Sequence, residues 1–383
     1  MPNFSIYVHV PWCRRRCPYC DFYLVVGKPK GNYIQCLMTE WWNRCEFLRG
    51  TDATSLYLGG GTPSLLDPMD IETFIDHLSN NGALVPDAEI TIEVNPEDLI
   101  GDYVERLAKT RINRVSIGAQ SLDDSILMKL GRKHRKNDAL MAIKKLQWAG
   151  FKNISVDLII GVMGEEEDAI LTSLEELFNM GIPHISTYLL SIEEGTKYHS
   201  NLLHNKRHAL NDDEQADIYR SVQKRLMELG YEQYDISSYG QPGFFSRHNQ
   251  VYWANGSYLG LGPGAHSMQV LAEGGIERTH NRISLEKWLS NPTNKEDMSI
   301  VRIEPKEALL ESLAFGLRNM SKGISPHALA RRHQASIPSD FSQLMKKYRS
   351  FKWLNEDHNG IRITREGALF ADAIMRDILC LRR

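Results

Sequence analysis

The chain has 383 residues, which allows two domains or one large α/β domain with additions. With 42% hydrophobic and 24% charged residues it has the composition of an ordinary soluble globular protein. The formal net charge of −3 gives no global attraction for nucleic acid, and no apolar run is long enough to cross a bilayer.

Short β-rich runs alternate with longer segments of helical period in the first half of the chain. Such strand–helix units predict a parallel sheet with right-handed crossovers, either doubly wound or curved into a partial barrel. Polar motifs follow nearly every strand, at the ends where α/β folds place ligands, and one shared site favours the barrel. The predicted strands are Ser5–Val10, Ser55–Gly59, Glu89–Val94, Arg114–Gly118, Ile154–Ile160 and His184–Leu190. The predicted helices include Tyr33–Leu48, Asp98–Lys109, Lys136–Ala149 and Ala169–Met180.

This alternation ends at about residue 200, so we expect the partial barrel to occupy residues 1–200. Residues 201–300 form an intermediate region, with a helix predicted over Asp212–Leu229 and a short strand over Glu232–Ile236.

Residues 301–383 are predicted to form a separate C-terminal module that reads helix, helix, helix, strand, strand, helix. The two strands, Lys352–Asn355 and Gly360–Thr364, form a hairpin before the helix Glu366–Leu379. This order resembles a winged-helix module, and such modules either bind nucleic acid or pack against another domain. Lys and Arg outnumber Asp and Glu by 15 to 9 here, which we interpret as a solvated or docking surface.

The segment Met1-Pro2-Asn3 runs directly into a strand pattern, without the basic segment and apolar core of a signal peptide. We therefore expect a cytoplasmic protein. In that reducing compartment its six cysteines are metal ligands or buried thiols rather than disulfides. Three of them are expected to be small buried side chains: Cys36, Cys45 and Cys380.

The other three, Cys13, Cys17 and Cys20, form a C-x3-C-x2-C motif directly after the first predicted strand. Three thiolates can hold three irons of a [4Fe–4S] cube, whereas an electron-transfer cluster takes four cysteines. The remaining iron keeps an open position, as a catalytic metal does, and S-adenosylmethionine (SAM) can chelate it through its amino and carboxylate groups. A structural zinc site with His9 as the fourth ligand is the alternative.

The cysteine motif, with Gly59-Gly60-Gly61-Thr62-Pro63 after the second strand, resembles the radical SAM proteins around oxygen-independent coproporphyrinogen III oxidase. The resemblance extends over essentially the whole chain. It implies an α/β fold with a partial (β/α)6 barrel, a [4Fe–4S] cluster, SAM and an electron donor. The SAM contacts that it implies are Tyr7, Gly60, Gly61, Thr62, Glu93, Gln120, Arg132 and Asp157. Of these, Glu93 can accept hydrogen bonds from ribose hydroxyls or the SAM ammonium, and Arg132 can pair with the SAM carboxylate.

The stretch from His248 to Trp253 matches H-N-x-x-Y-W, a motif associated with heme binding in the HemW heme chaperones. The flanking segments Tyr231–Ser237 and Tyr258–Ser267 also look like that family. The resemblance implies heme contacts from His248, Asn249, Tyr252 and Trp253. His248 would be an axial ligand, and the two aromatic rings would stack on the porphyrin. The alternative is that His248 hydrogen-bonds the backbone and Trp253 is part of the core.

Two features separate this sequence from the oxidase. Phe22 occupies the place of the fourth cysteine in C-x3-C-x2-C-x-C, and the cluster loop begins at residue 13, without the oxidase's N-terminal extension. We therefore predict a heme chaperone that holds a SAM-ligated cluster and passes heme to an acceptor protein, without coproporphyrinogen III oxidase activity. The alternative is a radical SAM enzyme of tetrapyrrole metabolism similar to that oxidase. A DNA-binding regulator is the third class considered, and we expect no nucleic-acid partner.

Overall fold

The computed structural model describes residues 4–48, 51–204, 209–358 and 360–382, so Met1–Asn3 lie outside the described residues. Its centre is a series of parallel strands in which each strand pairs with the next one of the series, without a reversal of order among the described strands. A doubly wound sheet would reverse its order, so this series forms the predicted partial (β/α)6 barrel. The strands are β1 (Ser5–Val10), β4 (Ala53–Gly60), β5 (Leu84–Val94), β6 (Arg114–Gln120), β7 (Asn153–Ile160) and β8 (His184–Leu189).

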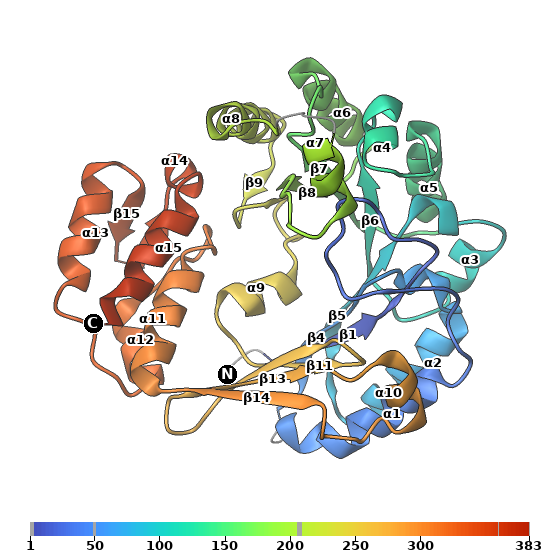
Figure 1. Ribbon diagram of the computed structural model, residues 1–383, viewed down its shortest axis with the longest axis horizontal. Helices are drawn as coiled ribbons and strands as arrows, with labels where there is room; N and C mark the ends of the chain where they lie inside the picture. Colours follow the sequence, from blue (N-terminus) through green and yellow to red (C-terminus); the bar gives the residue numbers. More distant parts are fainter. Residues whose placement is uncertain (1–3, 49–50, 205–208, 359, 383) are drawn as a thin grey trace.

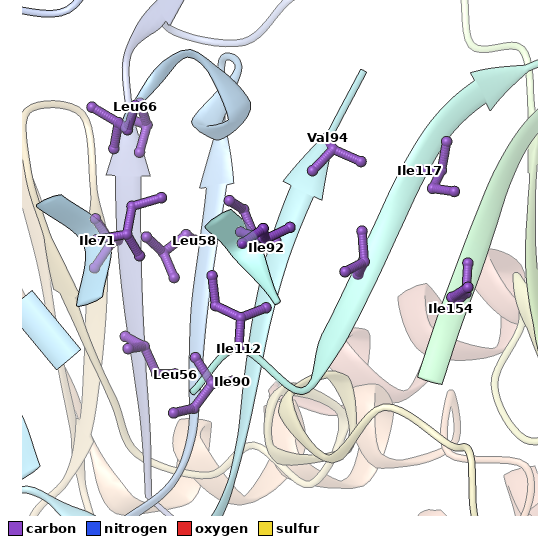
Figure 2. Packing of buried hydrophobic residues seen from close by; sticks show 14 of the residues in the cluster. Leu56, Leu58, Leu66, Ile71, Ile90, Ile92, Val94, Ile112, Ile117 and Ile154 are labelled. Atoms are coloured by element: carbon purple, nitrogen blue, oxygen red, sulfur yellow. The ribbon is translucent and has the colours of Figure 1, made fainter. Parts of the chain in front are cut away.

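Helices cover the outer face of this barrel, because alternate strand residues are apolar and point outward. Leu56, Leu58, Ile90 and Ile92 are buried in the core between sheet and helices, where Figure 2 shows them beside Ile71. The helices of this layer are α1 (Tyr33–Arg44), α2 (Pro68–Asn80), α3 (Tyr103–Leu107), α4 (Asp124–Lys129), α5 (Lys136–Trp148) and α6 (Glu167–Asn179). The intervening strand residues face the barrel interior, and on β4 and β5 they include Tyr57, Thr91 and Glu93. The same alternation therefore builds an apolar outer layer and a polar interior.

The intermediate region extends the same sheet at both ends. Next to β1 come β11 (Tyr258–Leu261), β12 (His266–Val270), β13 (Ile276–Asn281) and β14 (Met298–Ile303), and beyond β8 lie β10 (Ser238–Gly240) and β9 (Glu232–Gln233). The described strands of this sheet number 12. The predicted strand Glu232–Ile236 is shorter in the structure, because the Asp235 side chain accepts hydrogen bonds from the N–H groups of Ser237 and Ser238 and turns the chain.

A short helix of this region, α9 (Arg247–Trp253), lies inside the ring of strands (Figure 1). The Glu89 carboxylate on β5 accepts hydrogen bonds from the N–H groups of Arg247 (3.1 Å) and His248 (3.0 Å), the first residues of the helix. Because Glu89 lies before Thr91 and Glu93 on its strand, α9 closes the barrel interior at the amino end of the sheet. The other helices here are α7 (Lys197–His204), α8 (Asp212–Glu228) and α10 (Leu285–Ser290).

The C-terminal module has its own hydrophobic core, which includes Leu313, Tyr348, Ile363 and Ile374. Its element order agrees with the winged-helix-like prediction, and it lies beside the barrel in Figure 1. The elements are α11 (Pro305–Gly316), α12 (Pro326–Arg332), α13 (Phe341–Ser350), β15 (Leu354–Asp357), β16 (Gly360–Ile363), α14 (Arg365–Ala368) and α15 (Ala371–Leu379).

The predicted final helix Glu366–Leu379 is two helices in the structure. They meet at Phe370, whose ring stacks on Trp353 at 3.8 Å between centroids, and a side chain on Gly367 would collide with the Trp353 carbonyl. Packing of this aromatic pair therefore interrupts the helical period. Across the described residues, none of the helices has the length and apolar character needed to cross a bilayer.

Candidate functional site

The three cysteines of the C-x3-C-x2-C motif lie together on the loop that follows β1. Cys13 ends a short strand, β2 (Trp12–Cys13), which pairs with β3 (Val25–Val26), and the N–H of Cys20 donates to the Cys17 carbonyl. The Thr62 hydroxyl donates to the Cys13 sulfur at 3.2 Å. Burial raises the pKa of the Cys13 thiol, the Thr62 hydrogen bond opposes that shift, and the neighbouring Cys20 and Cys17 thiols add to it. Three thiolates at these positions would repel one another, and a cationic iron cluster would relieve that repulsion.

The cysteines form part of the wall of one cavity of about 930 Å³ at the carboxyl ends of the parallel strands. The structure brings almost all of the predicted SAM residues to the same cavity from four successive strands, β4 to β7, or the connections that follow them. Those on its wall are Gly60, Gly61, Thr62, Glu93, Gln120, Arg132 and Asp157. A single cavity thus joins the proposed cluster ligands and the proposed SAM contacts.

Two half-buried carboxylates face this cavity. Glu93 accepts a hydrogen bond from the Tyr57 hydroxyl (2.8 Å), and burial raises its pKa to about 7 against the effect of that bond. Asp157 accepts hydrogen bonds from Ser116 (2.7 Å) and Ser155 (3.3 Å), and burial also raises its pKa. Carboxylates that desolvation penalises in this way favour a cationic ligand, and SAM carries both an ammonium and a sulfonium.

Arg132 contributes positive charge to the cavity, whose lining also includes Arg14, Arg15 and Lys133. Its guanidinium donates to Asn95 Oδ1 at 2.5 Å and to the Gly118 carbonyl at 3.1 Å, and another nitrogen lies 3.6 Å from the Cys17 sulfur. Its Nε is buried and has no hydrogen-bond partner among the described residues. Buried guanidinium N–H groups normally have acceptors, so this one fits a carboxylate ligand.

The glycines after β4 are needed for contacts within the protein. A side chain on Gly61 would come within 2.6 Å of the Trp12 carbonyl, and one on Gly60 would come within 2.6 Å of the His9 ring. Gly60 also has a φ of +105°, which L side chains rarely adopt. The cysteine loop therefore packs directly against this turn, and the turn presents its other side to the cavity.

Three polar residues that support the cavity wall around Arg132 were not predicted from the sequence: Asn95, Glu97 and His134. Asn95 joins Arg132 to Thr62, since its amide donates to Thr62 Oγ1 at 3.3 Å. Glu97 is partly buried, which raises its pKa, but the hydrogen bond to His134 and the charge of Arg132 lower it to about 2. A local signal was present, because Asn95 directly follows β5, two residues after Glu93, and His134 lies two residues after Arg132.

Tyr7, the remaining predicted SAM contact, is not on the cavity wall but lies behind it. Its hydroxyl is 3.1 Å from His9 Nδ1, and its ring lies 6.3 Å from the Tyr57 ring. The second ring nitrogen of His9 is 2.9 Å from the Tyr23 carbonyl. Both nitrogens of His9 therefore have protein partners, which disfavours the zinc alternative in which His9 joins the cysteines.

His248 is buried in the interior behind the cavity. Its Nδ1 is 3.0 Å from Ser55 Oγ and its Nε2 is 2.9 Å from the Tyr252 hydroxyl, and its ring stacks on Tyr57 at 4.9 Å between centroids. Burial lowers its pKa to about 3, so the ring is neutral. In this arrangement neither ring nitrogen has a free lone pair directed at a heme. The assignment of His248 as an axial ligand stays a prediction, and it requires α9 to open.

The other residues of the H-N-x-x-Y-W motif take different places. Asn249 reaches the cavity wall. Trp253 instead donates from Nε1 to Asp235 Oδ2 at 3.1 Å, and the guanidinium of Arg318 lies over its ring at 4.6 Å. Since Arg318 follows α11, Trp253 joins the barrel to the C-terminal module.

Comparisons with known proteins agree with this geometry. The model of the Radical SAM superfamily matches residues 7–177, which extend from β1 to near the end of α6. The heme chaperone HemW of Lactococcus lactis subsp. lactis is 30% identical over 369 residues, covering 96% of this chain and 94% of the relative. This chain belongs to the HemW family of radical SAM proteins. HemW of Escherichia coli is 35% identical over 283 residues, covering 73% of this chain and 74% of the relative.

Among solved structures, coproporphyrinogen III oxidase (HemN) from Escherichia coli has a TM-score of 0.78 with 19% sequence identity, covering 98% of this chain and 90% of that chain. At that identity the likeness establishes the fold alone. In this HemW-family chain the C-terminal module and the intermediate region are thus included in the shared architecture, together with the barrel.

For this HemW-family chain we expect Arg132→Ala to weaken SAM binding while the cluster is retained, because Arg132 is a predicted SAM contact and not a predicted iron ligand. A lost charge-assisted hydrogen bond costs about 1.5–3 kcal/mol, roughly ten- to hundredfold in affinity. Isothermal titration of SAM into cluster-loaded protein measures this change, and iron analysis checks the cluster. The matched control is Arg135→Ala, whose side chain is 78% exposed. Equal SAM affinity in Arg132→Ala and wild type would contradict the assignment.

Proposed function

We propose that this protein is a heme chaperone that holds a [4Fe–4S] cluster on Cys13, Cys17 and Cys20, binds SAM at the cluster, binds heme, and passes heme to an acceptor protein. The observation that carries this proposal is the likeness over nearly the whole chain to a relative named heme chaperone HemW. The unpartnered Nε of Arg132 and the half-buried carboxylates of Glu93 and Asp157 supply a cavity whose charges fit SAM.

The groups that would be bound supply chemistry that protein side chains lack. A cluster with SAM on its open iron gives access to one-electron chemistry once an electron donor reduces it. The residues of this chain would bind and orient SAM: Arg132 toward its carboxylate, and Glu93 toward its ammonium or ribose. The polar interior behind them, closed by α9, would keep the bound group apart from bulk water.

Phe22 supports the chaperone over the oxidase. It occupies the position of the oxidase's fourth cysteine, it lines the cavity, and its side chain is 67% exposed. An apolar ring cannot ligate iron or carry a proton, so it supplies a surface instead of a reactive group. Exposed apolar side chains at a cavity are typical of binding surfaces.

The cysteines outside the motif fit a reducing compartment, and we propose that the protein acts in the cytoplasm. Cys36, Cys45 and Cys380 are free thiols. We propose that the C-terminal module acts by docking and does not bind nucleic acid. Part of its surface already packs against the intermediate region of the same chain. Arg332 donates to the Ala254 carbonyl just after α9, and His333 contacts the Gly274 carbonyl at 2.6 Å.

One preparation can test the chaperone against the oxidase. We expect anaerobically purified protein to bind about one heme per chain and to leave coproporphyrinogen III unchanged, because Phe22 replaces a cysteine of the oxidase motif. Hemin titration followed by absorption measures the first result, and product analysis by liquid chromatography measures the second. Steady conversion to protoporphyrinogen IX would overturn the chaperone and establish the oxidase-like alternative.

A further inference from the structure

A pair of histidines lies on the strands that extend the sheet beyond β1. His266 on β12 and His280 on β13 are direct cross-strand partners, and their rings stack at 3.8 Å between centroids with an angle of 12°. Two protonated imidazoles at this distance would repel each other. Two neutral rings avoid this cost and leave lone pairs for a metal.

His266 is the accessible member of the pair. It is exposed, and its ring nitrogens make no hydrogen bond within the described part of the chain. His280 is half-buried, and its Nδ1 accepts a hydrogen bond from Arg282 Nε at 3.3 Å. Burial together with the charges of Arg282 and Arg278 lowers the pKa of His266. A neutral exposed imidazole is the form that ligates iron. His266 therefore has ring nitrogens free to bind iron, whereas both ring nitrogens of His248 are hydrogen-bonded within the protein.

The surroundings of His266 match the other parts of a heme. The segment from Phe22 to Val26 lies close by, since the Tyr23 ring packs against Gly264, two residues before His266. In this segment Phe22 is 67% exposed and Val26 is 59% exposed. These apolar side chains offer a surface for the porphyrin face.

Arg282 offers a partner for a heme propionate. Its side chain is exposed, and it forms no ion pair with the residues that the structure describes. A guanidinium next to the ligand histidine can pair bidentately with a carboxylate. Arg278, in contrast, is already paired with Glu311 at 2.7 Å. A positive charge (Arg282), an apolar surface (Phe22 and Val26) and an iron ligand (His266) therefore lie close together beside the cysteine loop.

We propose that heme binds at this surface with His266 as an axial ligand, His280 stacked behind it, and Arg282 on a propionate. This assignment rests on the proposed heme-chaperone function and deepens it by naming the ligand. It places heme beside the segment Phe22–Val26, of which Phe22 and Leu24 also line the cluster cavity.

Hemin titration of cluster-loaded protein tests the proposal with four variants. We expect His266→Ala to bind hemin about tenfold more weakly, equivalent to about 1.4 kcal/mol, and to lose the wild-type Soret position. His266→Tyr should still bind hemin but show the absorption and electron paramagnetic resonance signature of tyrosinate ligation, which a merely structural residue would not produce. The matched control is His358→Ala, an exposed histidine on the C-terminal hairpin, which should behave as wild type. Circular dichroism and iron content check that each variant folds and keeps its cluster.

The fourth variant, His248→Ala, separates the two candidate ligands. Wild-type spectra in both His266 variants, with a changed spectrum in His248→Ala, would overturn the proposal and leave the heme-chaperone function standing. Unchanged spectra in all the variants would also overturn it. If wild-type protein binds no hemin at all, the chaperone function falls and the proposal with it.

Discussion

Replacing Cys17 with alanine should remove essentially all iron from the anaerobically reconstituted protein, which should otherwise contain about four irons per chain. A cube held by three thiolates has no spare protein ligand, so loss of one leaves two irons of the cube without a cysteine. Cys13→Ala and Cys20→Ala should have the same effect. Iron and sulfide analysis, together with the charge-transfer absorption of the cluster, measures the result.

Two other cysteines serve as controls for this experiment. Cys36 is buried against the Leu289 carbonyl and Cys380 is exposed near the C-terminal end, and alanine at either position should leave the iron content unchanged. Stoichiometric zinc without visible charge-transfer absorption in wild type would instead support the structural-zinc alternative and remove the radical SAM chemistry proposed for this chain.

Replacing Glu40 with alanine should lower the free energy of unfolding by about 3–5 kcal/mol, the cost of removing one partner of a buried ion pair. Glu40 is 2% exposed on α1 and accepts hydrogen bonds from the Gly262 N–H (2.8 Å), Trp288 Nε1 (3.0 Å) and Asn281 Nδ2 (3.1 Å). Its other partner, Arg44 at 3.2 Å, has a side chain that is only 10% exposed and would be left without this counterion. Urea unfolding followed by circular dichroism measures the change.

The control for this variant is Glu46→Ala, an exposed carboxylate just after the same helix, for which we expect a change within about 0.5 kcal/mol. A similarly small effect in Glu40→Ala would mean that the network does not bind the intermediate region to the barrel. The network matters for the domain division, since Glu40 belongs to the segment 1–200 and its donors Gly262, Asn281 and Trp288 belong to 201–300. The proposed boundary at residue 201 therefore separates segments that share one sheet and one buried network.

The repeated strands could be predicted because each carries its own period-two pattern and its own polar residue at the carboxyl end. The strand Ser5–Val10 has the same bounds in sequence and structure, and the others differ by a few residues. The predicted helix Asp98–Lys109 shows where local pattern fails. Asp98 is held by the Ser64 hydroxyl and by Arg14, and Gly101 has a φ of +59°, so the helix begins only at Tyr103. Contacts from distant segments decide that boundary.

The same limit applies to the site. Most of the predicted SAM residues could be placed on one cavity because parallel strands bring their carboxyl ends to one edge. The position of His248 could not be predicted, because its partners Ser55 and Glu89 lie far away in the sequence and nothing local shows that α9 enters the barrel. Nor does the sequence show that His266 and His280 stack, since strand register decides it.

Trp253 is held by Asp235 and by Arg318, and this links the C-terminal module to the cavity through α9. Asn249 and Trp253 are four residues apart on α9, about one turn, so the first contributes to the cavity wall while the second is held between Asp235 and Arg318. A protein that docks on the C-terminal module and displaces Arg318 would therefore free one end of α9. The helix would then move as one rigid unit. The end of α9 at Asn249 would move at the cavity wall, and the acceptor protein of the proposed function would trigger the exchange of a bound group without reaching into the barrel.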